Sequence, residues 1–464
     1  MRALIRLVAV TLAGAVLYYA GLVNAMVIQR PSPVGALLVV GGIAVSMVML
    51  VAALAGDGTG DARAPAERRY VGVHRIAWLV VCVMALVGAS WLFAAPRERA
   101  GDATPYHNDA IALNECAARL VLQGRDPYAS LNIFDCYAQL GIGADRTTPL
   151  KLGQFANVAV YPTDDQLEAA WALRAREGGN VEFVSRPSYP ALSFLLIIPF
   201  VALGWDSNRL YVLCLIAAMA LVVWRTSAGL RPFMLTAVLG AASLAAFTVS
   251  GSADLLYVLP LTVAWLWRER RWSALAYGIA AATKQLAWFF APFYLIAVIT
   301  MHGWREGLRR TAIAAAVFVA TNLPFILAHP RGWLEGITTP VSDPMFARGA
   351  GIIFLGTNGG LPLLPANAYL ALEGVCALIC LVVAWRSRRT SPELGVVLAL
   401  VPLFFAWRSL FSYFFLIPLF AAVAVARMPL GDLTPERAQA AGALTLFALP
   451  ARRLALIARR GRAA

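Results

Sequence analysis

The chain has 464 residues, of which 60% are apolar and 14% are charged, and its formal net charge is +14. This composition excludes an ordinary soluble globular protein and indicates a chain whose main solvent is lipid. The basic excess does not indicate nucleic-acid binding, because the arginines stand in short clusters between apolar runs rather than among aromatic residues on one polar face. We therefore expect an all-α polytopic integral membrane protein.

Apolar runs long enough to cross about 30 Å of hydrocarbon recur along the chain. The clearest are 7–28, 34–54, 76–95, 210–224, 232–249, 311–328, 367–385 and 410–426. The first run is longer than the apolar part of a typical signal peptide and has no convincing cleavage site after it, so we interpret it as a membrane anchor. With the shorter apolar segments included, the sequence predicts about 12 transmembrane helices plus one re-entrant segment.

The hydrophobic pattern divides the chain into five parts. These are three transmembrane helices in 1–95, a polar insertion in 96–188, a membrane core in 189–310, C-terminal membrane helices in 311–427 with an outer loop at 329–366, and a basic tail in 428–464. Arginine clusters between the apolar runs follow the positive-inside rule, which places the insertion outside the cytoplasmic membrane. The tail either lies on anionic lipid or is disordered.

Two helices are expected in the polar insertion. The first, 108–124, has apolar residues at helical spacing and a stop at Gly124. The second, 162–179, begins with Thr163 followed three residues later by Gln166, which is the pattern of a capping box.

The insertion also contains Cys116 and Cys136. An oxidising exterior favours a disulfide between them, closing a loop of about 20 residues, over two free thiols.

The arginine clusters also fix which polar residues share the outer face. The segment 272–300 must be a hairpin of two short helices with Lys284, one of only two lysines in the chain, at its outer tip. The segment 188–204 is short and contains two prolines, so we expect it to be re-entrant or non-spanning. The same topology places Asp254, Arg348 and Arg408 outside, on the side of the insertion that contains Asp109.

Charged groups at membrane depth cost about 2.5 kcal/mol or more, so these five residues are candidate functional groups. Two structural alternatives stay open. Lys284 can pair with Asp254 merely to hold helices together, and Arg408 can extend to the membrane interface.

A carboxylate and several cations facing one leaflet suit sugar transfer from a polyprenyl phosphate. The leaving phosphate needs cations to stabilise its developing charge but no proton, and the acceptor hydroxyl needs one base. This differs from glycoside hydrolysis, in which a poor leaving group requires a second, acidic carboxyl group.

The segments "NDAIALNECAARLVLQGRDPYAS" (108–130), "SRPSYPALSFLLIIPFVALG" (185–204) and 250–298 resemble, in this order, parts of GT-C polytopic glycosyltransferases. The third segment is similar to family 87, which includes polyprenol-phosphate-mannose-dependent mannosyltransferases of actinobacteria. The resemblance covers roughly 95–310. It implies a GT-C-like fold and an inverting transferase that moves a sugar, mannose for this family, from a polyprenyl phosphate to an acceptor hydroxyl.

The resemblance places the catalytic base on Asp109 and a ligand of the donor phosphate on Lys284. Asp102 is a rival for the base, and His107 either orients the base or is a solvated loop residue. Tyr128, in an Asp-Pro-Tyr turn, is a possible substrate contact. The chain departs from the family by lacking a Gln before Asp254, which leaves a substrate contact there open.

The expected partners are the lipid-linked sugar donor, a glycolipid, polysaccharide or protein acceptor, and the lipid bilayer, but no nucleic acid. The Gly- and Pro-rich segment 343–365 is either a loop that gates the donor or a plain connection. No cluster of metal ligands or paired aspartates is evident, so we expect neither a cofactor nor a metal. The alternative function is a transporter or lipid flippase, although the chain lacks the internal repeat that is usual in such proteins.

Overall fold

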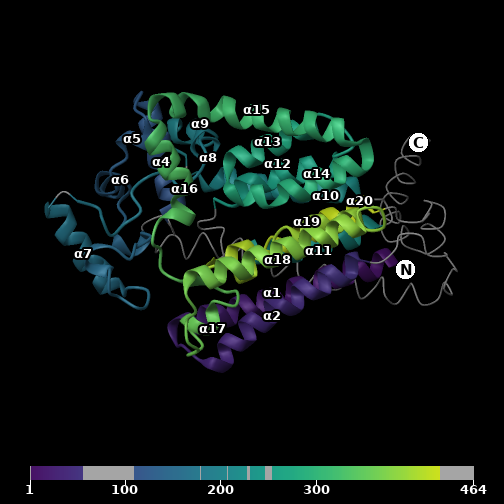
Figure 1. Ribbon diagram of the computed structural model, residues 1–464, viewed down its shortest axis with the longest axis horizontal. Coiled ribbons are helices and arrows are strands. Elements are labelled where there is room, and N and C mark those ends of the chain that lie inside the picture. Colours follow the sequence, from purple (N-terminus) through teal and green to yellow (C-terminus); the bar gives the residue numbers. More distant parts are fainter. Residues whose placement is uncertain are drawn as a thin grey trace, which may run out of the picture.

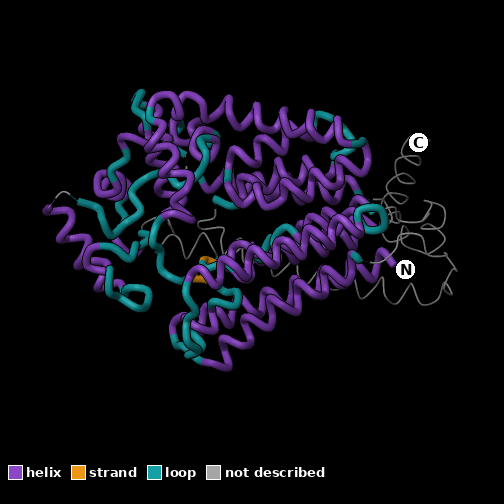
Figure 2. The backbone as a smooth tube through the Cα atoms, viewed as in Figure 1, coloured by secondary structure: helices purple, strands orange, loops and turns teal. Residues whose placement is uncertain are grey.

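The structure of the chain is a computed structural model that describes residues 2–55, 109–177, 179–205, 207–226, 230–245 and 253–428. It is mostly helical, and its only paired strands among these residues form one short parallel pair (Figure 2). Helices lie side by side in a bundle, and a polar domain, defined as 109–190, lies at the end opposite the N-terminus (Figure 1). The apolar run 76–95, Asp102, His107 and the tail lie outside the described residues.

The bundle contains both long and short helices. Their bounds are α1 Arg2–Gln29, α2 Pro33–Leu54, α8 Leu192–Leu195, α9 Ile198–Ala202, α10 Asn208–Arg225, α11 Arg231–Ala245, α12 Leu255–Leu266, α13 Ser273–Thr283, α14 Ala291–His302, α15 Trp304–Ala328, α16 Pro330–Ser342, α17 Phe354–Thr357, α18 Ala366–Ser387, α19 Gly395–Leu398 and α20 Ile417–Arg427. Short 3₁₀ turns are η4 Gln285–Phe290, η5 Pro392–Leu394, η6 Val401–Phe405 and η7 Phe411–Tyr413, and the strands are β1 Arg348–Gly349 and β2 Arg408–Ser409.

Five helices in the described part of the chain are long and apolar enough to cross a membrane. They are Ile5–Gln29, Pro33–Leu54, Gln285–His302, Trp304–Ala328 and Ala366–Ser387. Other apolar helices of 10–17 residues pack among them. These features fit the predicted polytopic membrane protein, whereas the count of about 12 spans stays a prediction.

The polar domain is more structured than its sequence indicated. Its elements are α4 Asp109–Leu122, α5 Pro127–Ser130, α6 Ile133–Leu140, η1 Ala144–Arg146, η2 Gly153–Phe155 and α7 Asp164–Glu177. The two expected helices are α4 and α7. The capping box is confirmed, since the Thr163 backbone N–H donates to Gln166 Oε1 at 3.0 Å and the Gln166 N–H donates to Thr163 Oγ1 at 3.4 Å.

Helix α6 was not predicted from the sequence, although its signals are present. Asn132 caps the helix by accepting a hydrogen bond from the Phe134 N–H, and Gly141 ends it with a φ of 65°. Helix α6 carries Cys136, which forms a disulfide with Cys116 of α4. The bridge ties α6 to α4, whose first residue is Asp109.

The segment 188–204 forms only α8 and α9, which pack against α4. The two helices extend over 11 residues, Leu192–Ala202, which is about half of the length that an α-helix needs to cross the hydrocarbon core. The segment therefore does not cross the membrane as a single helix, as its prolines and short length led us to expect.

The predicted hairpin 272–300 is α13, η4 and α14, with Lys284 at the turn between the first two. Helix α13 lies directly on α15, because a Cβ atom at Gly278 would be 2.9 Å from the Ala314 carbonyl oxygen. The glycine thus permits a close approach that holds the hairpin against the longest membrane helix of this part of the bundle.

The apolar run 410–426 is not one continuous helix, contrary to the sequence analysis. It begins as η7 and becomes α-helical only at Ile417. Pro418 occupies the first turn of α20, where its missing N–H needs no helical partner, and the preceding residues carry the strand β2. The 3₁₀ turn η7, which directly follows the strand β2, therefore replaces the first turns of the expected helix.

At the end of the bundle opposite the polar domain, Arg268, Arg310 and Arg427 join four segments in one network of ion pairs and hydrogen bonds. Arg268 makes a bidentate ion pair with Glu393, and Arg427 pairs with Glu269 at 2.9 Å. Arg310 donates to the backbone carbonyl oxygens of Arg268 and Glu269. Two of the predicted arginine clusters, 268–271 and 305–310, thus meet at one end of the molecule.

We predict that replacing both bridged cysteines by serine, Cys116→Ser with Cys136→Ser, destabilises the polar domain. A bridge closing a loop of about 20 residues is worth roughly 3 kcal/mol. Thermal unfolding in lipid nanodiscs should show a midpoint lower by several degrees, with Cys376→Ser on α18 as the control. An unchanged midpoint would show that the bridge does not restrain the domain.

Candidate active site

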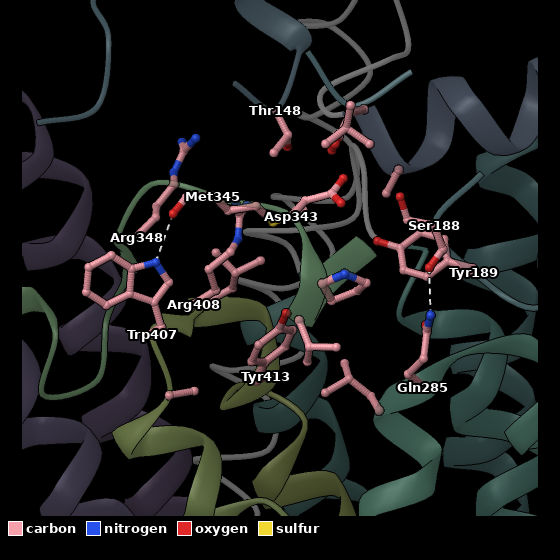
Figure 3. Close-up of a pocket in the computed structure, with 18 of the residues that line it drawn as sticks. Thr148, Ser188, Tyr189, Gln285, Asp343, Met345, Arg348, Trp407, Arg408 and Tyr413 are labelled. Carbon is pink, nitrogen blue, oxygen red and sulfur yellow. Dashed lines mark hydrogen bonds between the residues drawn. The ribbon is translucent and has the colours of Figure 1, made fainter. Parts of the chain in front are cut away.

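A cavity of about 1160 Å³ lies where the polar domain meets the bundle (Figure 3). Its walls come from the start of α4, the segments 145–151 and 188–189, the turn after α13, α16, the N-terminal end of α18, and the strand regions. The five ionisable residues that the topology placed on one face all line this cavity: Asp109, Asp254, Lys284, Arg348 and Arg408.

Lys284 lines the cavity at the point where α13 ends. We call the part of the lining formed by Lys284 and Asp254 the floor. The Lys284 backbone is extended, with φ −155° and ψ 141°, so the side chain leaves the helix axis. The ammonium group forms an ion pair with Asp254, at the start of α12, and lies 4.6 Å from the centre of the Tyr189 ring. Lys284 and Asp254 are 7% and 5% exposed, so the two charges neutralise each other in a site with little water.

The next residue, Gln285, attaches this floor to the polar domain. Its Nε2 atom donates to the Ser188 carbonyl oxygen at 2.6 Å and to the Ile337 carbonyl oxygen at 3.1 Å. One side chain therefore fixes the turn after α13 against both the 188–189 segment and α16.

Arg348 and Arg408 are adjacent because β1 and β2 pair in parallel with these two residues in register. The pairing is close: a Cβ atom at Gly349 would be 2.3 Å from the Ser409 carbonyl oxygen. Trp407 donates from Nε1 to the Met345 carbonyl oxygen at 2.9 Å, which adds a side-chain contact beside the strands. The backbone thus sets the spacing of the two guanidinium groups.

Neither arginine has an ion-pair partner within the described ranges. The Arg408 Nη1 atom is buried and has no hydrogen-bond partner among the described residues. Arg348 lies with its Cζ atom 4.4 Å from the centre of the Tyr161 ring. Two cations are therefore held by backbone and aromatic contacts, with donors left for an anionic ligand.

Asp109 is the first residue of α4, where a carboxylate interacts favourably with the helix dipole. In the part of the chain that the structure describes, its carboxylate has neither a hydrogen bond nor an ion pair. Burial raises the pKa of Tyr161, while the charges of Arg348 and Arg408 lower it and that of Asp109 raises it further. The carboxylate and both arginines therefore lie close enough to this tyrosine to affect its pKa.

Two predicted site residues are not placed in the cavity lining. Tyr128 is buried beside it, donating from its hydroxyl to the Tyr189 carbonyl oxygen at 2.7 Å and packing its ring on Phe194 and Phe325. Asp126, expected in a turn, caps α5 by accepting from the Tyr128 N–H. Tyr128 thus supports the Tyr189 segment from behind, and His107 lies outside the described residues.

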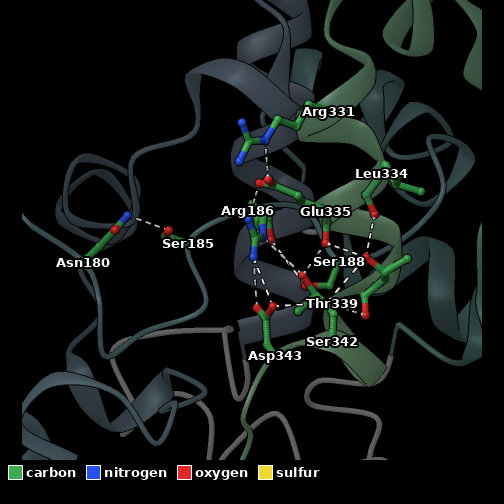
Figure 4. A network of polar contacts seen from close by, with 11 residues as sticks. Asn180, Ser185, Arg186, Ser188, Arg331, Leu334, Glu335, Thr339, Ser342 and Asp343 are labelled. Atoms are coloured by element: carbon green, nitrogen blue, oxygen red, sulfur yellow. Dashed lines mark hydrogen bonds and ion pairs between the residues drawn. The ribbon is translucent and has the colours of Figure 1, made fainter.

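An ion-pair network fastens α16 to the polar domain next to the cavity (Figure 4). Arg186 donates to Glu335 at 2.8 Å, to Thr339 at 3.2 Å and to both carboxylate oxygens of Asp343. Asp343 begins the segment that leads to β1, so this network restrains the chain that carries Arg348.

Several residues of the lining were not predicted from the sequence, including Tyr189, Trp407, Tyr413, Glu373 and Lys151. Each is far from Asp109 in sequence, and aromatic residues in an apolar chain give no signal that separates a cavity wall from a core. The rarity of lysine was the one available signal for Lys151. Among the described residues, no three His, Cys, Asp or Glu side chains form a metal-binding group.

A stretch of 64 residues, 14% of the chain, is 36% identical to the Dol-P-Man:Man(5)GlcNAc(2)-PP-Dol alpha-1,3-mannosyltransferase of Mus musculus. The protein of the same name from Homo sapiens is 33% identical over 64 residues. The chain covers 15% of the length of each of these relatives. No protein family matches the chain, and no solved structure matches it.

We predict that Asp254→Asn and Lys284→Met each lower the thermal stability strongly, because each leaves one buried charge without its partner at a cost of about 3–5 kcal/mol. The double variant should recover much of this loss, since it removes both charges. Unfolding midpoints in nanodiscs measure the coupling. Additive losses in the double variant would contradict a direct ion pair.

Proposed function

We propose that the chain is an inverting glycosyltransferase that moves a sugar, mannose in the first instance, from a polyprenyl phosphate to an acceptor hydroxyl. The observation that carries the proposal is that an unpaired carboxylate, Asp109, shares one cavity with two arginines that have no anionic partner among the described residues. The partial similarity to two Dol-P-Man-dependent mannosyltransferases supports the donor class.

In this proposal, the donor phosphate binds to Arg408 and Arg348. The phosphate diester carries one negative charge, and it gains a second as the bond between the sugar and its phosphate oxygen breaks. Two guanidinium groups fixed side by side stabilise this developing charge without rearrangement. Lys284 also contributes to binding the phosphate, because its ammonium group has three N–H donors and the ion pair with Asp254 does not use all of them. This contribution is weaker than that of the arginines, because Asp254 already neutralises the charge of Lys284.

Asp109 acts as the general base. The acceptor oxygen attacks the anomeric carbon from the face opposite the phosphate, and its proton passes to the Asp109 carboxylate. The electron pair of the broken bond leaves on the phosphate. One carboxylate is sufficient because the leaving group needs no proton, and a single displacement inverts the anomeric configuration. This chemistry needs no cofactor, and arginine takes the role that a divalent ion has in many phosphate sites.

The positive-inside pattern supports an extracytoplasmic site, since the arginine network lies at the end of the bundle opposite the cavity. We place the reaction at the outer face of the cytoplasmic membrane, where a glycolipid, a polysaccharide or a protein hydroxyl can act as the acceptor. The large polar domain then covers the acceptor side of the cavity.

We predict that Asp109→Asn lowers kcat by about 10²–10⁴-fold, because it removes the general base. The assay uses the full chain in nanodiscs, radiolabelled polyprenyl-phosphate sugars and total membrane lipid as the acceptor source. Asp165→Asn, an exposed carboxylate of α7, is the matched control and should keep full activity. Full activity of Asp109→Asn, or substrate movement without transfer, would replace this proposal by the transporter alternative.

We also predict that Arg408→Gln lowers kcat by about 10²–10³-fold, since it removes a charge that acts on the leaving phosphate. Arg408→Lys should recover part of the rate because it restores the charge but not the planar pair of donors. Single-turnover transfer from the labelled donor measures this step directly. Equal rates for Arg408→Gln and the wild type would place the donor phosphate elsewhere.

A further inference from the structure

The cavity holds opposite charges that do not pair with each other. Asp109, Arg348 and Arg408 all line it, and none of the three has an ion pair among the described residues. Opposite charges in one cavity attract each other more strongly than in bulk water, because the effective dielectric constant is lower. The proposed reaction needs a free carboxylate and free cations, so the structure must keep them apart.

Two of these three side chains are restrained by the elements that carry them. Asp109 is the first residue of α4, where the helix dipole favours its carboxylate. Arg408 lies on the paired strand β2, and its Nη1 atom is buried. Arg348 differs because it is exposed. Strand β1 fixes the point at which its side chain begins, but it does not fix the direction of the guanidinium group.

The ring of Tyr161 supplies that direction. The Arg348 Cζ atom lies 4.4 Å from the ring centre, a distance at which an aromatic face attracts a guanidinium group. Tyr161 belongs to the polar domain, in the segment between η2 and α7, and it is not part of the cavity lining. The Asp109 carboxylate is also close enough to affect the pKa of Tyr161. Tyr161 therefore lies near both kinds of charge without contacting the cavity.

The position of the Tyr161 ring is set by packing. Its hydroxyl donates a long hydrogen bond to the Thr147 carbonyl oxygen at 3.5 Å. The ring packs edge-on against Phe346 with centres 5.9 Å apart, and Phe346 is 1% exposed and packs in turn on Phe155 at 6.4 Å. The ring cannot follow the guanidinium group, so a guanidinium group that turned toward Asp109 would lose this contact.

We propose, on the basis of the function proposed above, that Tyr161 is a positioning residue that keeps Arg348 from pairing with the general base Asp109. The ring face holds the guanidinium group where it binds the leaving phosphate. Two groups thereby stay available at once, a free carboxylate and a free cation. Without the ring, Arg348 turns to Asp109, which occupies the cation and stabilises the charged, less basic form of the carboxylate.

Other charged and titratable groups near Asp109 do not take this place. They come from several segments: Tyr137 of α6, Asp145 of η1, Tyr189 of the 188–189 segment, Lys151 and Arg408. Asp145 is paired with Arg146 at 3.0 Å. Lys151 lies over the Phe346 ring at 5.2 Å, and strand pairing restrains Arg408. Arg348 is thus the exposed cation whose direction depends on one ring.

The test measures kcat and the pH dependence of kcat/KM for the donor, with the full chain in nanodiscs. Tyr161→Leu should lower kcat about 10²-fold, because the leaving phosphate loses a cation. The pH below which kcat/KM falls should also move down by about one unit, since an arginine paired with the base favours its charged form. Tyr161→Phe keeps the ring and should stay within about threefold of the wild-type kcat, with the same pH dependence.

Two further variants separate this role from a merely structural one. Adding Arg348→Gln to Tyr161→Leu should return the pH dependence to that of the wild type while kcat stays low. Phe155→Leu removes the ring on the other side of Phe346 and should leave the pH dependence unchanged. Tyr161→Met replaces Tyr161→Leu if the latter does not fold. An unchanged pH dependence in Tyr161→Leu, or one that stays shifted after Arg348→Gln is added, would overturn the proposal.

Absence of transfer by the wild type from every donor would instead reject the proposed transferase. Calorimetric titration with methyl phosphate then tests Tyr161 without any reaction. Tyr161→Leu and Arg348→Gln should each raise the Kd of the wild type about tenfold, and the double variant should raise it no further, because both changes remove one contact. Additive losses, or a wild type that does not bind methyl phosphate, would overturn the role of Tyr161.

Discussion

The buried ion pair between Lys284 and Asp254 is the constraint on which the cavity depends. A lone lysine at this depth would be costly, and a lone aspartate equally so, but together they join the start of α12 to the end of α13. The pair leaves the floor polar yet nearly neutral. The positive charge of the cavity is then concentrated at Arg348 and Arg408, which lie side by side in the lining, because the charge of Lys284 is already neutralised.

The walls are held to this floor by a small number of polar contacts between distant segments. Gln285 joins the turn after α13 to the 188–189 segment and α16, and Arg186 joins the polar domain to the end of α16. Asn322 of α15 adds a third contact, accepting from the Ala191 N–H at 3.0 Å and from Trp333 Nε1 at 3.1 Å. The polar domain is therefore fixed to the bundle by side-chain contacts and is not merely tethered to it.

Sequence reasoning reached the general architecture because lipid imposes strong rules on it. Apolar length and arginine placement located several of the helices and grouped Lys284 with Asp109, and local capping signals located α4 and α7. It failed where long-range backbone pairing decides the structure. The strand β2 ends just before the apolar run 410–426, which was expected to be one helix but begins as η7, and nothing near Arg408 indicates that Arg348 is its partner in register. The aromatic residues of the cavity lining could not be predicted from the sequence either, because only tertiary packing distinguishes a lining residue such as Trp407 from a core residue.

The strand pair has a consequence for how this site can change in evolution. Side chains alternate between the two faces of a strand, so a single-residue insertion or deletion beside β1 or β2 would turn one arginine away from the other. A substitution of an arginine alters one contact, whereas a shift in register removes the alignment of both while leaving the composition of the chain almost unchanged. The segments around β1 and β2 should therefore keep a constant length in functional relatives, even where their residues vary.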